Sequence, residues 1–148
     1  MKFVIQRVLR ARVKSGGIWV GEIGPGIVSL IGIGKSDTEA TVRKAIEKIV
    51  RLRIFEAENG NGKMDRSLID VGGSHLMVSQ FTLFADLSKG NRPSFLEAAG
   101  PESALSLFEF AVQVSRELGV QTEAGKFQTH MEVDLVNDGP VTLCGEMN

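Results

Sequence analysis

The segment Ile27-Val28-Ser29-Leu30-Ile31-Gly32-Ile33 is the part of the sequence that decides the fold. It is almost continuously apolar, and the turn residues Gly24-Pro25-Gly26 precede it. A short apolar run bounded by turn residues is typical of a strand that is covered on both faces. We therefore predict a buried strand here and expect the other elements to be arranged around it.

The residues before this strand also predict β-structure. Residues 2–13 alternate, with mostly apolar side chains at odd positions and many polar or charged side chains at even positions. Ser15-Gly16-Gly17 predicts a turn, and Ile18-Trp19-Val20 begins a second strand. Two strands are thus expected before the buried one.

After the buried strand, two helices alternate with strands. Ser36 or Asp37 is the predicted cap of a helix that runs roughly to Arg53. Pro101 suits the first turn of a second helix, and Gly119 suits its carboxyl end. The predicted order is β-β-β-α-β-α-β-β, with a further strand near Val120 left open. The expected fold is α/β: a single domain over residues 1–148, with a layered sheet or partly closed barrel and two main helices. The last strands are expected at 75–84, 131–135 and 141–143.

Charge and composition restrict the classes of function. The chain has 148 residues and a net charge of −1, whereas proteins that bind many phosphates carry a large basic surplus. An action on RNA would therefore concern a short end of the molecule. No apolar run reaches the ~18 residues that suggest a membrane span, and charge follows Met1 too soon for a secretory leader. We expect no membrane and no DNA partner, and a cytoplasmic protein.

Cysteine and histidine are scarce. The single Cys144 excludes an internal disulfide, and its apolar neighbours favour a small core residue. His75 and His130 do not combine with Cys144 at metal-ligand spacing. We expect neither a metal site nor a cofactor.

The first candidate motif is Ser79-Gln80-Phe81-Thr82-Leu83, which places polar and aromatic groups on a hydrophobic strand. One interpretation is a strand with one solvated face. The other is a pocket wall that offers hydroxyls and backbone N–H groups. These five residues alone do not decide between the two interpretations.

The second candidate motif is Asn137-Asp138-Gly139-Pro140-Val141-Thr142. Asp-Gly favours a hairpin turn, but Pro140 lacks an N–H where a return strand would begin to pair. A Gly-Pro bond can also be cis at a cost of only ~0.5–1 kcal/mol, which would form a rigid tip with exposed carbonyls. The hairpin and the rigid tip both stay open.

Arg7 is the third candidate, because it lies on the apolar face of the first strand. A buried guanidinium without partners is very costly. Arg7 therefore needs carboxylate or carbonyl acceptors, unless it reaches water at a strand edge.

Taken together, these motifs resemble those of the D-aminoacyl-tRNA deacylases, in the D-tyrosyl-tRNA deacylase family. The likeness covers essentially the whole chain and is densest around the two signature motifs. Further matching blocks include Gln6-Arg7-Val8, Val20–Gly26, Asp37–Ala40, Leu52–Phe55, Asp70–Gly73, Val78–Asp86, Lys89–Phe95 and Leu135–Leu143.

The resemblance implies a homodimer with its active site at the subunit interface. It assigns Ser79, Gln80, Phe81 and Thr82 to the catalytic pocket that receives the 3′-terminal adenosine of aminoacyl-tRNA and its amino acid. It implies that a cis Gly139–Pro140 bond enters the pocket of the other subunit. The family arginine that holds this dipeptide corresponds to Arg7. Phe127 and Met131 correspond to residues near the adenine, although Gln128-Thr129-His130 departs from the small residues that are commoner there.

The implied reaction is hydrolysis of the ester of D-aminoacyl-tRNA, a proofreading step in translation. Glycyl-tRNA is a further expected substrate, because glycine has no side chain to reject. Thr82 is a nucleophile candidate by position, but no base is evident beside it. We favour catalysis by a positioned water and the neighbouring ribose hydroxyl, with backbone N–H groups near Phe81 and Thr82 stabilising the oxyanion.

Three alternatives remain open. An editing hydrolase for another misacylated tRNA would share these motifs. A non-catalytic RNA- or nucleotide-binding module would bind without ester loss, and would usually be more basic. A purely structural dimer would leave the second motif unexplained.

Overall fold

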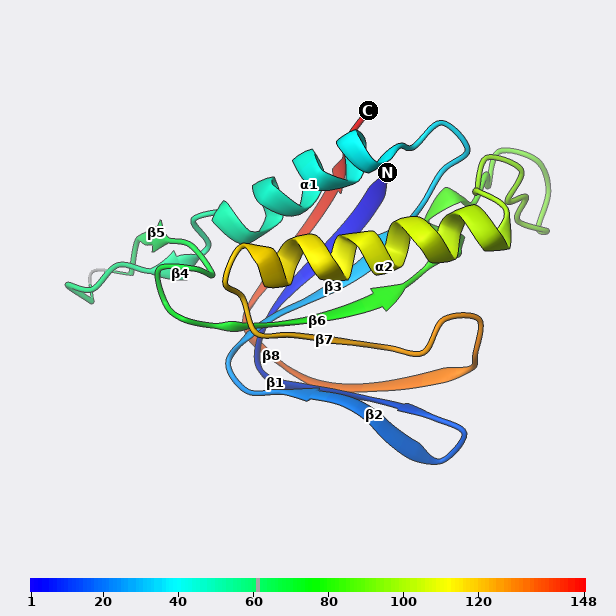
Figure 1. Cartoon of the computed structure of the whole chain (residues 1–148). Coiled ribbons are helices and arrows are strands. Elements are labelled where there is room, and N and C mark those ends of the chain that lie inside the picture. Colours follow the sequence, from blue (N-terminus) through cyan, green and yellow to red (C-terminus); the bar gives the residue numbers. More distant parts are fainter. Residues whose placement is uncertain (61) are drawn as a thin grey trace.

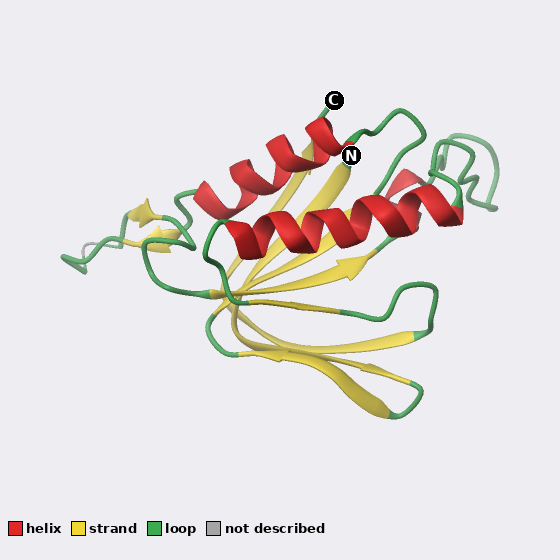
Figure 2. Ribbon diagram, in the orientation of Figure 1, coloured by secondary structure: helices red, strands yellow, loops and turns green. Residues whose placement is uncertain are grey.

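A curled sheet and two helices form the fold, which the computed structural model describes for residues 1–60 and 62–148 (Figure 1). The main sheet of this part is six-stranded, with the order β2-β1-β3-β6-β7, and β8 pairs with β1. Both helices lie over the same side of the sheet (Figure 2). These features confirm the predicted α/β class with a partly closed barrel. The elements are β1 (Lys2–Ser15), β2 (Ile18–Ile23), β3 (Gly26–Gly32), α1 (Glu39–Arg51), β4 (Phe55–Glu56), β5 (Met64–Arg66), β6 (Ser74–Ser79), the 3₁₀ helix η1 (Phe81–Phe84), α2 (Pro101–Glu117), β7 (Thr122–Ala124) and β8 (Met131–Glu146).

The long strand β1 joins the two halves of the sheet. Residues 2–8 of β1 pair with β3, and residues 11–15 pair with β2. Along its other edge, β1 pairs with β8 over almost its whole length. Because β1 contributes to both halves, the sheet curls around a small interior that its own side chains fill.

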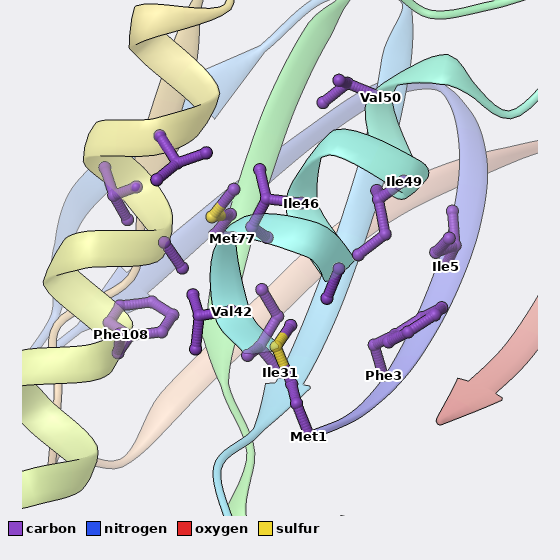
Figure 3. Close-up of a cluster of buried hydrophobic side chains, with 14 of the residues drawn as sticks. Met1, Phe3, Ile5, Ile31, Val42, Ile46, Ile49, Val50, Met77 and Phe108 are labelled. Carbon is purple, nitrogen blue, oxygen red and sulfur yellow. The ribbon is translucent and has the colours of Figure 1, made fainter. Parts of the chain in front are cut away.

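The predicted buried strand is β3, and both of its faces are covered. Ile27 and Ile31 belong to the main core beneath the helices, together with Ile46 of α1 and Phe108 of α2 (Figure 3). Val28 faces the other way, into a second cluster inside the curled sheet. Complete burial of one such aliphatic side chain contributes roughly 1.5–3 kcal/mol.

A chain of buried hydrogen bonds crosses the core beside these clusters. His75 is fully buried, with Nε2 2.8 Å from Ser29 Oγ and Nδ1 3.1 Å from Ser115 Oγ. Thr122 Oγ1 lies 2.8 Å from Ser115 Oγ and donates to the carbonyl of Val120. Because a carbonyl can only accept, the donors run from Ser29 through His75, Ser115 and Thr122 to Val120. This direction assigns the proton of a neutral His75 to Nδ1.

The helix ends differ slightly from the predicted ones. Thr38 caps α1, since its hydroxyl accepts a hydrogen bond from the N–H of Thr41. The cap is therefore neither Ser36 nor Asp37, the two expected residues, and Asp37 instead accepts a hydrogen bond from the N–H of Gly34 at 2.6 Å. The prediction for α2 is confirmed, because Pro101 opens the helix. Neither helix has the length and apolar character needed to cross a bilayer.

Three other predictions are wrong. The strand expected at 75–84 ends at Ser79 because Gln80 leaves the extended conformation, and a 3₁₀ helix follows. The separate strands expected at 131–135 and 141–143 are one strand, β8, so of the two interpretations left open for Asp138-Gly139 the hairpin does not form. Cys144 is exposed, since the polar side of the alternating strand β8 carries it. Val120 itself precedes a short strand, β7, which resolves the open element there.

Candidate functional site

A cavity of about 730 Å³ opens at the carboxyl ends of β3 and β6. Its walls come from η1, from the start of α2, and from the loop between β7 and β8. The backbone N–H of Gln80 donates to the carbonyl of Ile31 at 2.7 Å, which ties η1 to the neighbouring strand. The cavity therefore forms where two parallel strands stop and their following segments diverge, a common place for ligand sites.

The first signature motif supplies the polar wall. Ser79, Gln80 and Phe81 line the cavity, whereas Thr82 lies just outside the lining and is exposed. The side-chain amide of Gln80 donates to the hydroxyl of Thr82. Within the described residues, no acceptor is recorded for the backbone N–H groups of Phe81 and Thr82. These two donors are available to a ligand.

Aromatic and thioether groups form the other walls. Phe127 and Met131 both line the cavity, and Phe127 packs against Phe108 with ring centroids 6.3 Å apart. Phe81 and Phe95, which also line the cavity, meet edge-on with ring centroids 5.1 Å apart. Such surfaces suit the flat face of a nucleobase. The sequence did not identify Phe95 and Phe108 as site residues, because the elements that bring them to the cavity are far from the signature motifs.

The loop before β8 has an unusual backbone. Gln128 has a φ of 55°, the left-handed region that few residues other than glycine adopt. Thr129 holds this turn, because its hydroxyl donates to the carbonyl of Lys126 and lies 2.8 Å from Ser15 Oγ. Gly125 leaves room for Met131, since a Cβ there would be 2.6 Å from Met131 Sδ. The loop thus sets the position of the thioether.

The cavity is nearly free of ionisable groups. Of the described residues that line it, His130 alone carries an ionisable side chain. The carboxylates, histidines and cysteine of the described chain form no cluster of three that could hold a metal ion. Among the described residues, the hydroxyl of Thr82 contacts the side-chain amide of Gln80, and no base lies within hydrogen-bond distance of it. The lining can position and stabilise, but it offers little for general acid–base chemistry.

Arg7 and the second signature motif meet at another place. Arg7 is 14% exposed, and its Nη1 donates to the carbonyl of Ile54 at 2.5 Å. Its Nε lies 3.2 Å from the carbonyl oxygen and 3.0 Å from the carboxylate of Asp138. The prediction that Arg7 needs such acceptors is confirmed. The guanidinium supports the adjacent Gly139–Pro140 bond, which is cis.

The sequence-predicted site residues therefore form two groups within one chain. Arg7 pairs with Ile27, which pairs with His75, so the Gly139–Pro140 tip lies level with His75 across the sheet. Ser79 is four residues further along the strand, or about 13 Å at 3.3 Å per residue. Arg7, Gly139 and Pro140 do not line the cavity of their own chain.

Comparison with other sequences gives consistent matches. The family model described as D-Tyr-tRNA(Tyr) deacylase matches residues 4–146. The D-aminoacyl-tRNA deacylase of Heliobacterium modesticaldum is 54% identical over 99% of this chain and 96% of its own length. That of Symbiobacterium thermophilum is 52% identical over 97% of this chain and 93% of its own length.

Solved structures share the fold. One named c-Myc DNA Unwinding Element Binding Protein has a TM-score of 0.91 and 39% identity, covering 99% of this chain and 98% of its own. A second, described as a probable eukaryotic D-amino acid tRNA deacylase, has a TM-score of 0.84 over 97% of both chains. At 16% identity, this second likeness concerns the fold alone.

Proposed function

The chain belongs to the D-aminoacyl-tRNA deacylase family, and on that premise we propose that it hydrolyses the ester joining a D-amino acid to the 3′ end of tRNA. The products are free tRNA and the D-amino acid. The observation that carries this proposal is the cavity with Ser79, Gln80 and Phe81 on one wall and Phe127 and Met131 on another. Its volume and aromatic surfaces suit one terminal adenosine with its ester. We place the reaction in the cytoplasm, where charged tRNA is used.

In this mechanism the adenine lies between Phe127 and Met131, and the ester carbonyl points to the free N–H groups of Phe81 and Thr82. Hydrolysis passes through a tetrahedral oxyanion, which such donors stabilise. Removal of one oxyanion donor in a hydrolase costs roughly 3–4 kcal/mol of transition-state energy. The chain's own residues thus contribute orientation and electrostatics, without a covalent intermediate.

Thr82 acts through position in this scheme and not as a nucleophile. Its recorded partner is the amide of Gln80, which cannot accept a proton from a hydroxyl during attack. A water molecule attacks, assisted by the neighbouring ribose hydroxyl of the tRNA. We expect Thr82→Ala to deacylate within a few-fold of the wild-type rate. A Thr82→Ala protein that is folded but has lost activity by orders of magnitude would restore the nucleophile role.

Selection against L-amino acids is assigned to the Gly139–Pro140 tip of a second subunit. Both residues are exposed, and along the strand direction they are offset by about 13 Å from Ser79 of their own cavity. Because Pro140 has no backbone N–H, its backbone offers only a carbonyl acceptor. The tip can therefore accept hydrogen bonds from the ammonium group of the substrate. A D-amino acid then directs its side chain outward, whereas an L-amino acid directs it into the tip. Glycine has no side chain to collide with the tip, so glycyl-tRNA is a second substrate.

The substrate part of this proposal is tested by matched esters. Wild-type protein is incubated with tRNA carrying a D-amino acid, its L-enantiomer or glycine, and ester loss is followed. We expect rapid loss of the D- and glycyl-esters and persistence of the L-ester. Equal loss of the two enantiomers would refute the chiral role, and saturable binding without ester loss would favour an RNA-binding module.

The two-subunit part is tested by mixing defective proteins. Arg7→Ala removes the support of the tip but leaves the cavity lining, whereas Phe81→Ala damages the lining but leaves the tip. In a mixed dimer, the intact cavity of the first variant receives the intact tip of the second. Activity on D-aminoacyl-tRNA should therefore rise on mixing. Mass spectrometry shows whether the two variants have exchanged subunits. If they have and the activity on D-aminoacyl-tRNA does not rise, the tip and the cavity do not act together across the two subunits.

A further inference from the structure

The loop between η1 and α2 forms one rim of the cavity. The backbones of Asp86 and Ser94 pair with each other, with N···O distances of 2.7 and 3.1 Å, and close residues 87–93 into a loop. The next residue, Phe95, lines the cavity and packs on Phe81. In Figure 1 this green loop projects beyond the beginning of α2. The closed loop is therefore fixed beside the cavity mouth.

The loop carries positive charge that the protein does not use. Lys89 and Arg92 are both exposed, and neither has an ion pair or a side-chain hydrogen bond recorded among residues 1–60 and 62–148. Some exposed arginines of this chain have carboxylate partners, as Arg12 has Asp134 and Arg43 has Glu117, whereas others, such as Arg10 and Arg51, have no ion pair among the described residues. The acid nearest to Lys89 in the sequence, Asp86, accepts a hydrogen bond from the backbone N–H of Ser88.

We propose that Lys89 and Arg92 bind backbone phosphates of the RNA that leads into the cavity, immediately before its terminal adenosine. This inference rests on the proposed function, because it takes the ligand of the cavity to be the end of an RNA strand. The cavity itself is nearly uncharged, so it cannot hold the polyanionic strand that the adenosine terminates. Two cations at its rim supply that attraction while the whole chain keeps its net charge of −1.

The strength of the contact follows from the number of phosphates. Each neutralised phosphate contributes about −0.9 to the slope of log K against log salt for a duplex, and about −0.7 for a single strand. Two contacts thus contribute a slope of roughly −1.4 to −1.8. Over a rise from about 50 to about 200 mM salt, their contribution to affinity falls roughly tenfold.

The experiment uses fluorescence anisotropy to measure binding of a tRNA transcript that carries no amino acid, at several salt concentrations. The test variant is Lys89→Gln with Arg92→Gln, which keeps polar side chains of similar reach. Lys44→Gln with Lys48→Gln, on the exposed side of α1, is the matched control of equal charge. We expect the test variant to bind more weakly at low salt with a slope about 1.4–1.8 shallower, and the control to bind as wild type. Arg92→Lys should keep the wild-type slope.

Hydrolysis is measured separately on a D-aminoacyl ester of adenosine, which lacks the strand. If the wild-type protein cleaves neither this ester nor the matched tRNA ester, the proposed function fails. The phosphate surface still stands in that case if the test variant has a shallower slope of log K against log salt than the wild type. A test variant with the wild-type slope overturns the inference, whatever the hydrolysis shows. Dissociation of the variant into smaller species by sedimentation also overturns it, because the loop, with its exposed Leu87 and Leu96, would then be a subunit contact.

Discussion

Acidification tests the buried histidine network. Burial lowers the pKa of His75 from 6.5 to about 3, because the interior disfavours the imidazolium. As pH falls below 6.5, the unfolded chain takes up a proton at His75, whereas the native protein does so only near pH 3. The contribution of His75 to stability is therefore complete above pH 6.5 and is lost progressively down to about pH 3.

The expected size of the loss follows from these two pKa values. Between about pH 7 and pH 5, uptake by the unfolded state alone lowers the free energy of unfolding by about 2 kcal/mol. Urea unfolding at the two pH values measures this change as a shift in midpoint at constant slope. His75→Gln provides the reference, because it removes the imidazole of His75 and no other ionisable group.

The wild-type protein should lose about 2 kcal/mol more than His75→Gln between those pH values. If both proteins lose the same amount, His75 is not the group responsible, and the assignment of a neutral ring bonded to Ser29 and Ser115 is wrong. Should His75→Gln fail to fold, nitrogen chemical shifts of the wild-type imidazole decide the question. A ring that titrates near pH 6 in the native state would contradict the burial argument.

Three substitutions test the close packing described above. Gly125→Ala should displace the Met131 thioether and raise KM for D-aminoacyl-tRNA several-fold, which steady-state kinetics measures. The Tm, measured by calorimetry, should stay nearly unchanged because the clash is with the end of a flexible side chain. Gly26→Ala should prevent native folding, since its Cβ would be 1.9 Å from the carbonyl oxygen of Ser74, and circular dichroism would reveal a normally folded variant if this is wrong. Asp37→Asn should cost about 3 kcal/mol in urea unfolding, because Asp37 is the buried partner of the terminal ammonium group, and a cost below 1 kcal/mol would contradict that.

The strongly periodic parts of the fold could be predicted from the sequence. Ile27–Ile33 indicated a strand covered on both faces, and Pro101 marked the beginning of α2. The errors lie where local chemistry has two solutions. Asp138-Gly139 is a good hairpin turn in isolation, but pairing with β1 on both sides of it keeps β8 a single strand. Residues 81–84 have β-forming side chains, but the preceding Gln80 turns the backbone.

The site was predictable only as far as its motifs extend. Arg7 stood out because a cation on an apolar strand face requires acceptors, and the structure supplies Ile54 and Asp138. Phe95 and Phe108 gave no signal, since an aromatic residue in a loop or a helix stripe is ordinary. Their role depends on how α2 and its preceding loop fold over the sheet. The distance between the tip and its own cavity likewise follows from strand register, which local patterns do not specify.

The bulge in β8 limits which changes of chain length the protein can tolerate. Asn137 pairs with Val8 and Thr142 with Gln6, so residues 138–141 stand opposite Arg7 alone. Val141, the last residue of the bulge, and Leu143 beyond it both pack against the core and alternate with exposed neighbours. Deletion of one residue here would reverse which side chains of the rest of β8 face the core, so that Cys144 would point inward in place of Leu143. The number of residues between Asn137 and Thr142 is therefore constrained by the pairing of β8 with β1 on both sides of them.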